Sequence, residues 1–238
     1  MLEIKNIQAG YGPKNVLDGL SLNCLPGEVH GILGWNGAGK TTFFNTVFGF
    51  LPLRSGEILL DGRRATKHDI AFLETEPFFY PNLRGREFLE LVAGKNAPGL
   101  DHWQAILDLP LGEFVNNYST GMLKKLGIAG AFLQNRRVML LDEPFNGLDL
   151  ESSEKLGWLL RQTKQQGERI VLLSSHILPT LTGLCDKISR LQDGRTLKTY
   201  LPEAFAELEA EMRADVHAKL EALTNHQTVP ENPAAERF

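Results

Sequence analysis

Nine consecutive residues, Gly34 to Thr42, constrain the fold of this chain more than any other stretch. They read Gly-Trp-Asn-Gly-Ala-Gly-Lys-Thr-Thr and fit the pattern G-x-x-x-x-G-K-[ST]. A largely apolar run (29–33) precedes them, and residues 41–48 carry apolar side chains at helical spacing. Glycines let a loop curl so that backbone N–H groups point inward, where they bind phosphate oxygens. A strand, this loop and a helix in that order predict a phosphate-binding loop, in preference to a chance glycine-rich turn with a lysine.

The pattern also assigns roles to individual side chains. Lys40 is expected to reach the β- and γ-phosphates of a nucleoside triphosphate, and the Thr41 hydroxyl to hold Mg²⁺. The dipole of the following helix adds to the attraction for phosphate. We therefore predict that the whole loop binds nucleotide, through Gly34, Trp35, Asn36, Gly37, Ala38, Gly39, Lys40, Thr41 and Thr42.

Composition bounds the remaining possibilities. The 238 residues suffice for one large domain or two small ones, and a hydrophobic content of 42% supports a sizeable core. No stretch approaches the roughly 20 apolar residues that span a bilayer, and no apolar N-terminal segment resembles a signal peptide. The net charge of −4 resides in an acidic tail from Glu203 onward, which argues against a nucleic-acid surface. Cys24 and Cys185 are predicted to be buried thiols in a reducing, cytoplasmic setting.

The order of the expected elements indicates an α/β fold. The first third is rich in strands, expected at 2–7, 16–24, 28–33, 56–62 and 70–73. Helices are expected at 84–93, 101–107 and 120–133, and they form a small helical subdomain without strands. Strands at 138–141 and 170–173 then alternate with helices at 151–166 and 178–185, before a hairpin of 188–191 and 195–200. This alternation predicts a parallel sheet with helices on both faces.

Two acidic residues follow the buried strand at 138–141 in the arrangement called Walker B. In a parallel sheet the end of this strand is expected beside the phosphate-binding loop, at the edge where ligands bind. Asp142 is expected to position Mg²⁺ through its water shell, and Glu143 to act as a general base toward water at the γ-phosphate. The alternative is a strand followed by a solvated acid pair, and the phosphate-binding loop upstream argues against it.

Two further motifs are candidates for phosphate contacts. His176 ends the next buried strand and is expected level with Glu143, within reach of a γ-phosphate, although such a histidine alone is more often structural. Ser119 and Gly121 open a predicted helix within the sequence Tyr-Ser-Thr-Gly-Met, where a serine cap and a glycine leave N–H groups available to an anion. An ordinary helix cap is the alternative interpretation of this motif.

The tail is predicted to form an amphipathic helix over 202–224. Its apolar residues recur at helical spacing, namely Phe205, Leu208, Met212, Val216, Leu220 and Leu223. The outer face is acidic and anionic lipid would repel it, so we expect this helix to pack on its own domain. Residues 225–238, with two prolines, are predicted to be disordered.

In their order along the chain, these motifs resemble those of the ATP-binding subunits of ATP-binding cassette (ABC) transporters, over residues 1–201. Residues 34–42 match the Walker A loop, 140–144 match Walker B, and 118–122 stand where the family has Leu-Ser-Gly-Gly-Gln. Residues 146–149 match the D-loop, whose Asp149 is a candidate nucleotide contact. His176 matches the switch histidine, and Tyr11 matches the aromatic residue that stacks on adenine.

The resemblance implies a fold and a mode of action. The implied fold is a P-loop NTPase (RecA-like) core with an N-terminal antiparallel β subdomain and a helical subdomain inserted at about 77–133. In this family two subunits face head to tail and sandwich two ATP molecules with Mg²⁺. Ser119 and Gly121 would then touch the γ-phosphate held by the second subunit. Hydrolysis separates the halves, and that motion drives membrane subunits.

Three features depart from the family pattern. The signature reads Tyr-Ser-Thr-Gly-Met, which keeps the serine and the second glycine. The glutamine of the family's Q-loop aligns with Thr75, so Thr75 is a candidate metal-site residue, with Glu74 and Glu76 as alternatives. The segment from Thr75 to Tyr118 is short for the family, so a trimmed helical subdomain is expected.

The resulting prediction is an ATP-hydrolysing subunit at the cytoplasmic face of a membrane, working as a homodimer or heterodimer beneath separate transmembrane permease subunits, without nucleic acid. The Gly-Met form of the signature resembles exporter ATPases and favours export. At least one of three adjacent aromatic residues, Phe78, Phe79 or Tyr80, is expected to offer the permease an apolar anchor. The alternative is that these residues pack the helical subdomain against the core.

Three other kinds of ABC protein are alternatives. A soluble ABC ATPase of DNA repair or chromosome maintenance would carry a coiled coil or zinc module between Lys40 and Leu141, and none is found. A translation-factor type would carry two cassettes. A regulatory ATP-binding module would not need the intact catalytic set, although Thr75 keeps that interpretation open. The sequence names neither the substrate nor the permease.

Overall fold

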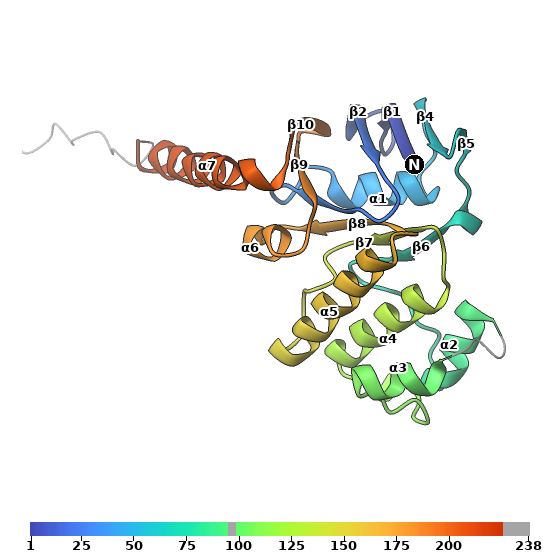
Figure 1. Cartoon of the computed structure of the whole chain (residues 1–238). Coiled ribbons are helices and arrows are strands. Elements are labelled where there is room, and N and C mark those ends of the chain that lie inside the picture. The colour runs from blue at the N-terminus through green and yellow to red at the C-terminus, as the bar shows by residue number, and fades with distance from the viewer. Residues whose placement is uncertain (95–98, 226–238) are drawn as a thin grey trace, which may run out of the picture. The chain divides into compact units, whose positions relative to one another are not determined.

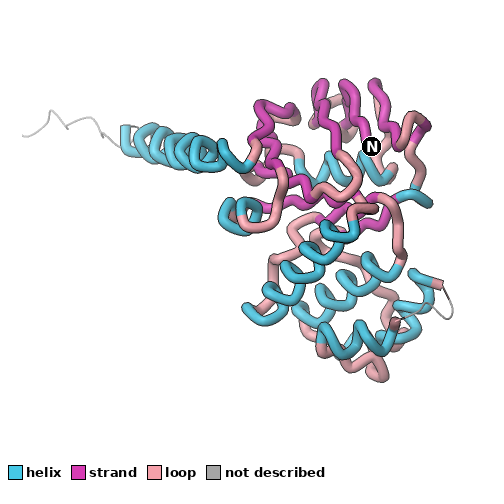
Figure 2. Tube along the Cα trace, in the orientation of Figure 1, coloured by secondary structure: helices cyan, strands magenta, loops and turns pink. Residues whose placement is uncertain are grey.

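The computed structural model of the chain describes residues 1–94 and 99–225. The chain divides into two compact units, Met1–Thr199 and Tyr200–Phe238. The first unit holds every candidate site residue and is drawn from blue to orange in Figure 1. Its strands and helices are drawn in different colours in Figure 2. Strands and helices both occur throughout this unit, and the predicted α/β fold is confirmed.

The larger sheet has six strands in the order β10-β9-β3-β8-β7-β6. They are β3 (Val29–Leu33), β6 (Ile70–Leu73), β7 (Val138–Leu141), β8 (Ile170–Ser175), β9 (Lys187–Gln192) and β10 (Arg195–Tyr200). β3 pairs in parallel with β8 and β9, and β7 pairs in parallel with β6 and β8. β3, β7 and β8 are buried along their whole length, which explains their nearly continuous apolar sequences.

The register brings the carboxyl ends of four strands to one edge of this sheet. Leu141 pairs with both Leu73 and Leu173, and Leu33 pairs with Ser175. The segments that follow β3, β6, β7 and β8 therefore emerge side by side, where ligands bind in open α/β sheets. The end of β7 lies beside the phosphate-binding loop, as predicted, because Thr41 Oγ1 donates to Asp142 Oδ2 at 2.8 Å. In the strand order, β8 lies between β7 and β3. Strand order is a property of the crossover connections, and apolar periodicity carries no information on it.

A second sheet of four strands lies in the order β2-β1-β4-β5. It comprises β1 (Leu2–Ala9), β2 (Leu17–Cys24), β4 (Ser55–Leu60) and β5 (Arg63–Arg64). β1 pairs antiparallel with β2 and β4, as expected for the N-terminal subdomain, whereas the two-residue β5 was not predicted.

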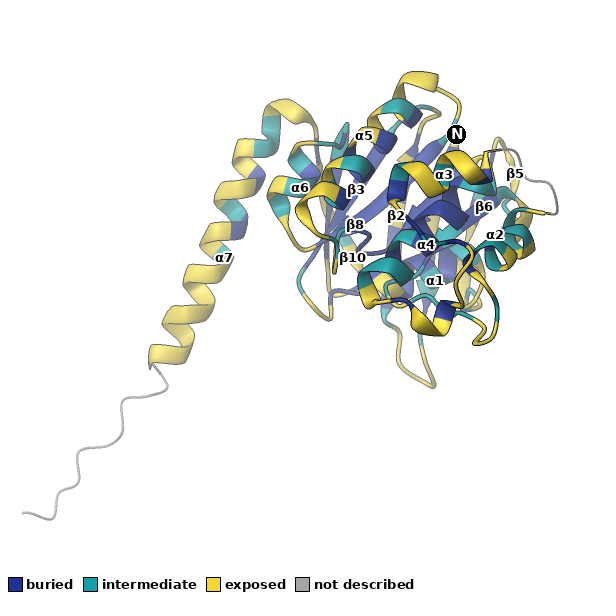
Figure 3. Ribbon diagram, turned by 90° about the horizontal axis from the view of Figure 1, so that it is seen from below, coloured by how far each residue is buried: buried dark blue, intermediate teal, exposed yellow. Residues whose placement is uncertain are grey.

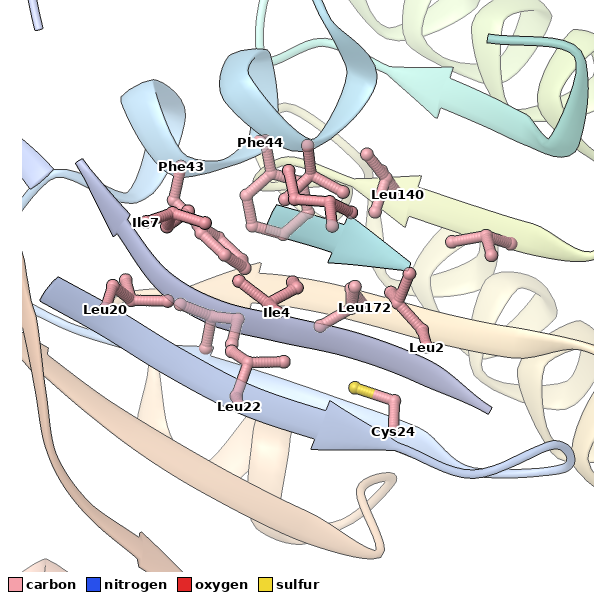
Figure 4. Packing of buried hydrophobic residues seen from close by; sticks show 14 of the residues in the cluster. Leu2, Ile4, Ile7, Leu20, Leu22, Cys24, Phe43, Phe44, Leu140 and Leu172 are labelled. Carbon is pink, nitrogen blue, oxygen red and sulfur yellow. The ribbon is translucent and has the colours of Figure 1, made fainter. Parts of the chain in front are cut away.

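One hydrophobic core joins the two sheets through helix α1 (Lys40–Phe48). Phe43 and Phe44 of α1 pack in one cluster with Ile4 of β1, Leu140 of β7 and Leu172 of β8 (Figure 4). All five side chains are almost completely buried. This packing fixes the helix that begins at Lys40, and with it the end of the phosphate-binding loop.

Three helices form the inserted subdomain: α2 (Gly85–Ala93), α3 (Leu100–Leu107) and α4 (Thr120–Leu133), with a short 3-10 turn at Val115–Asn117. Two glycines let α4 approach its neighbours. A Cβ at Gly127 would lie 2.7 Å from Leu73 at the end of β6, and one at Gly130 would lie 3.2 Å from Val92 of α2. The N-terminal half of α4 is thereby held against the end of β6.

The remaining helices of the first unit are α5 (Leu150–Gln166) and α6 (Leu178–Thr182). α6 ends earlier than predicted, because Gly183 is its C-cap. The central strands β3, β7 and β8 are buried, whereas exposed residues lie on the outer faces of the helices and on edge strands such as β5 and β10 (Figure 3).

The second unit contains a 3-10 turn (Pro202–Ala204) and helix α7 (Phe205–Asn225), where a helix was predicted. Val216, Leu220 and Leu223 of α7 are exposed. Residues 226–238, most of the tail predicted to be disordered, lie outside the described residues. Among the residues described, no helix combines the length and the apolar character needed to cross a membrane.

Candidate functional site

The loop after β3 has the geometry of a phosphate cradle. Gly37 and Gly39 have φ angles of 85° and 103°, a region that residues with side chains rarely adopt. Gly39 is the N-cap of α1 and offers no side-chain bond, so no side chain occupies the first N–H groups of the helix. Lys40 folds back over the loop and donates from Nζ to the Gly34 carbonyl at 2.8 Å. Backbone N–H groups and an ammonium thus face the same space.

The hairpin turn between β9 and β10 contacts this loop through backbone hydrogen bonds. The Gly194 N–H donates to the Ala38 carbonyl at 3.1 Å, and its carbonyl accepts from the Asp18 N–H at 3.0 Å. A Cβ at Gly194 would lie 1.7 Å from the Val16 carbonyl oxygen, so only glycine fits there. A Cβ at Gly34 would likewise lie 2.7 Å from a backbone oxygen of β9. Two glycines therefore let the loop sit directly on the sheet.

A pocket of about 430 Å³ gathers most of the predicted residues. Its lining consists of Val16, Trp35, Asn36, Gly37, Gly39, Lys40, Thr41, Thr42, Thr75, Glu143, Asn146 and His176. Sequence reasoning did not single out Val16 or Asn146 as site residues. Asn146 belongs to the D-loop motif and could have been found there, whereas Val16 carries no signal of its own.

Asp142 is completely buried at the base of this site and accepts three hydroxyl hydrogen bonds. Thr41 and Thr75 each donate to Oδ2 at 2.8 Å, and Ser174 donates to Oδ1 at 2.5 Å. Thr75, the residue that replaces the family's glutamine, is therefore held on the same carboxylate oxygen as Thr41. The neighbouring Glu74 is only partly buried, and its burial together with the Asp142 charge raises its pKa.

Glu143 lies between a lysine and a histidine. Its Oε1 is 3.5 Å from Lys40 Nζ, and its Oε2 is 3.0 Å from His176 Nδ1. The Glu143 N–H donates to Ser174 Oγ at 2.8 Å, and the residue has a φ of 48°, which is uncommon outside glycine. Ser174 thus fixes both acids of the Walker B pair. Sequence reasoning missed this role, although a polar residue in an otherwise apolar strand was the available signal.

Gly34 and Ala38 of the loop do not line the pocket, and neither do the four predicted nucleotide contacts outside the loop. Tyr11 is 56% exposed on the loop after β1. Ser119 caps α4 by accepting from the Met122 N–H at 3.2 Å, and a Cβ at Gly121 would lie 3.2 Å from the carbonyl of Gly147 in the D-loop. The fourth, Asp149, caps α5 by accepting from the Ser152 N–H at 2.7 Å, and this bond lowers its pKa. The signature therefore lies beside Gly147 of the D-loop, and of these two motifs only Asn146 lines the pocket.

Sequence reasoning also missed Lys124 on α4. Its side chain is buried, and Nζ donates to the carbonyls of Thr75 at 2.9 Å and Glu74 at 3.4 Å. Burial lowers the pKa of Lys124 to about 8, against the opposing influence of Asp142, Glu143 and Glu76. The available signal was a charged residue at the start of a helix whose later residues are almost all apolar.

Comparison with known proteins agrees with this geometry. Residues 17–146 match the family model described as ABC transporter. The uncharacterized ABC transporter ATP-binding protein YhcH of Bacillus subtilis is 33% identical over 210 residues, which cover 83% of this chain and 68% of YhcH. The lantibiotic transport ATP-binding protein SrtF of Streptococcus pyogenes is 31% identical over 205 residues, covering 83% of this chain and 89% of SrtF.

A solved structure of an ATP-binding subunit of an ABC transporter has the same fold. It is 30% identical to this chain and superposes with a TM-score of 0.75, over 84% of this chain and 90% of its own. The family match, the relatives and the pocket all agree with the resemblance that the motifs indicated. This chain therefore belongs to the ABC transporter family, whose ATP-binding ATPase cassette it forms.

Proposed function

We propose that this chain hydrolyses ATP with Glu143 as the general base and powers export through separate permease subunits at the cytoplasmic face of a membrane. The observation that carries the proposal is the convergence of Lys40, Glu143 and His176 on one pocket. Hydrolysis of a phosphoanhydride needs a cation that binds phosphate and a carboxylate that activates water, and a histidine beside the carboxylate can orient it.

The roles follow from the contacts. The N–H groups of the glycine-rich loop and the Lys40 ammonium would bind and orient the phosphates, which supplies most of the catalysis in phosphoryl transfer. Glu143 would take a proton from the attacking water. His176 would hold the Glu143 carboxylate in place, because its Nδ1 lies 3.0 Å from Oε2.

The residues around Asp142 fit a magnesium ion. Mg²⁺ prefers hard oxygen ligands and is usually held by one or two carboxylates together with substrate phosphates. One buried carboxylate with the Thr41 and Thr75 hydroxyls on its Oδ2 provides such a donor set. Bound there, Mg²⁺ would neutralise charge on the phosphates and make the terminal phosphorus easier to attack.

We further propose that the working form is a dimer, either of two copies or with a second ABC subunit. Ser119, Gly121 and Asp149 are predicted nucleotide contacts that do not line the pocket of their own subunit. They would complete the ATP site of a second subunit placed head to tail. The serine caps α4 with one N–H bond, and the first turn of that helix offers further N–H groups to a phosphate.

The direction of transport is proposed from the signature and from one relative. The Gly-Met form of the signature resembles exporter ATPases, and SrtF is described as a lantibiotic transport protein. A soluble ABC ATPase and a regulatory ATP-binding module remain the alternatives. Purification from membranes decides among them: a co-purifying permease supports the proposal, and a chain that binds ATP without hydrolysing it or binding any membrane subunit contradicts it.

The catalytic assignment is tested with Glu143→Gln. This variant should bind ATP normally but turn over roughly 10²–10⁴-fold more slowly, the usual contribution of a general base. It should also elute as an ATP-dependent dimer in gel filtration, because the sandwich forms and is not hydrolysed. Glu168→Gln, at an exposed glutamate away from the pocket, is the matched control. Near-normal turnover of Glu143→Gln would exclude Glu143 as the base.

The aromatic loop after Thr75 supports a docking site for the permease. Phe78 and Tyr80 are 71% and 56% exposed, and their rings contact each other at 5.3 Å. Phe79 instead packs inward on Phe88, with ring centroids 4.7 Å apart. An exposed aromatic pair in a family that binds permeases is a natural anchor.

The docking proposal is tested by single alanine substitutions. Phe78→Ala and Tyr80→Ala should weaken co-purification with the permease, by about 2 kcal/mol for a central anchor, while thermal stability and ATP affinity stay unchanged. Phe79→Ala is the matched comparison and should lower thermal stability first. Retention of the permease by both exposed-site variants would place the docking surface elsewhere.

A further inference from the structure

We propose that Lys124 is a positioning residue for ATP hydrolysis, which holds the backbone at Glu74 and Thr75 so that the Thr75 hydroxyl stays on Asp142. The inference rests on the proposed role of this site in hydrolysis. It assigns a function to a buried charge on α4 that the mechanism above does not use.

The contacts form a short chain from α4 to the acid. Lys124 Nζ donates to the Thr75 carbonyl at 2.9 Å and to the Glu74 carbonyl at 3.4 Å. On the other side of the same residue, Thr75 Oγ1 donates to Asp142 Oδ2 at 2.8 Å. Thr75 is therefore held by two hydrogen bonds: its carbonyl accepts from Lys124 of α4, and its hydroxyl donates to Asp142 at the end of β7.

The energetics favour a specific role for this lysine. Burial of an ammonium is costly unless the group is hydrogen-bonded, and a charged donor makes a stronger hydrogen bond than a neutral one. Within the described part of the chain, Lys124 forms no ion pair with a carboxylate, and its hydrogen bonds go to the two backbone carbonyls. Asp142, Glu143 and Glu76 favour its charged form from a distance. The ammonium is thus directed at the loop backbone, and a neutral side chain would hold that backbone less firmly.

The position of α4 would allow a movement of this helix to reach Thr75 through the Lys124 hydrogen bonds. Gly127, one turn beyond Lys124, brings the helix within van der Waals contact of Leu73, the residue before the segment that Lys124 holds. Ser119, the cap of the same helix, belongs to the predicted signature. A shift of α4 would therefore move the Thr75 carbonyl through Lys124, and with it the hydroxyl on Asp142.

A competing explanation is that Lys124 only fastens the helical subdomain to the core. The two explanations predict effects on different measured quantities, namely stability and kcat. A purely structural Lys124 would contribute to the stability of the fold whether or not Thr75 carries a hydroxyl. A positioning residue affects turnover, and its effect requires the Thr75 hydroxyl.

The experiment is a double-mutant cycle on the full chain, measuring kcat and KM for ATP and the melting temperature. The variants are Lys124→Met, which keeps the aliphatic stem and removes the charge, Thr75→Ala, and the two combined. Lys164→Met, which removes a surface lysine paired with Asp186, is the control. Should Lys124→Met fail to fold, Lys124→Gln replaces it, since it keeps a donor on a shorter side chain.

In the wild-type background, we expect Lys124→Met to lower kcat about tenfold with little change in KM. In the Thr75→Ala background, we expect the same substitution to change kcat less than about twofold, because the two residues are in contact and their effects are coupled. Equal losses in both backgrounds, or a lower melting temperature with unchanged kcat, would overturn the inference. The proposed function fails separately: it is refuted if wild-type ATP hydrolysis does not depend on Lys40. Wild-type hydrolysis with an equally active Lys124→Met variant would refute only the role of Lys124.

Discussion

Acidification is expected to destabilise this protein through one buried histidine, His30, on the strand that leads into the phosphate-binding loop. His30 is 1% exposed. Its Nδ1 lies 3.2 Å from Cys24 Sγ and its Nε2 lies 2.8 Å from Ser189 Oγ. Burial, with a smaller contribution from Lys187, lowers its pKa from 6.5 to about 3. The network around the ring accommodates a neutral imidazole, and nothing in it is an anion.

The sign and size of the effect follow from this shift. Because the folded state favours the neutral ring, the stabilisation is complete above the unfolded pKa of 6.5 and is lost as the pH falls toward 3. The full shift, 6.5 − 3 = 3.5 units at about 1.36 kcal/mol each, corresponds to about 4.8 kcal/mol. At a pH of about 4.5, two units below the unfolded value, about 2.7 kcal/mol of this is lost.

The assay is urea unfolding of the wild type and of His30→Gln at pH values of about 7.5 and 4.5. Glutamine keeps a hydrogen-bonding side chain but does not titrate, so the wild type should lose about 2.7 kcal/mol more than the variant between the two pH values. His68→Gln, at an exposed histidine, should lose as much as the wild type. Equal losses for the wild type and His30→Gln would refute the assignment of a buried neutral imidazole.

Two further predictions concern the nucleotide pocket. The fluorescence of Trp35, which lines the pocket, should change on addition of Mg-ATP and should not change in Lys40→Ala, whereas the two other tryptophans lie on helices outside the pocket; a response that persists without Trp35 would contradict this. Thr75→Ala should lower kcat more than Glu74→Ala or Glu76→Ala, because Thr75 is the one of these three residues whose side chain donates to the Walker B aspartate, Asp142. A larger loss for either glutamate would assign the role of the family's glutamine to that glutamate.

Local patterns predicted most of the fold. Continuous apolar runs such as 138–141 became buried parallel strands, and the alternation at 2–7 became a strand with one buried face. The Walker A pattern predicted strand, loop and helix with correct bounds to within a residue at α1. These predictions succeeded for the same reason. Each depends on residues that are close in sequence, whose burial follows the periodicity of one strand or helix.

The misses depend on contacts between distant residues. The position of β8 between β3 and β7 follows from the crossovers. Ser174 acts on two acids about 30 residues away, and Lys124 acts on a loop about 50 residues away. Gly194 is required because its Cβ would strike the backbone at Val16. A single sequence records the residue type at each of these positions but not the partner that it meets.

The two oxygens of Asp142 are controlled by different parts of the molecule. Oδ1 accepts from Ser174, which belongs to β8 and is fixed by the sheet. Oδ2 accepts from Thr41 at the start of α1 and from Thr75, whose backbone is bound by Lys124 of α4. A displacement of the helical subdomain would therefore reach Oδ2 through Thr75 while Oδ1 stayed in place. If the helical subdomain contacts a permease and a second subunit, as we propose, this asymmetry would let those partners shift the Thr75 hydroxyl on Asp142, the acid that we propose binds Mg²⁺.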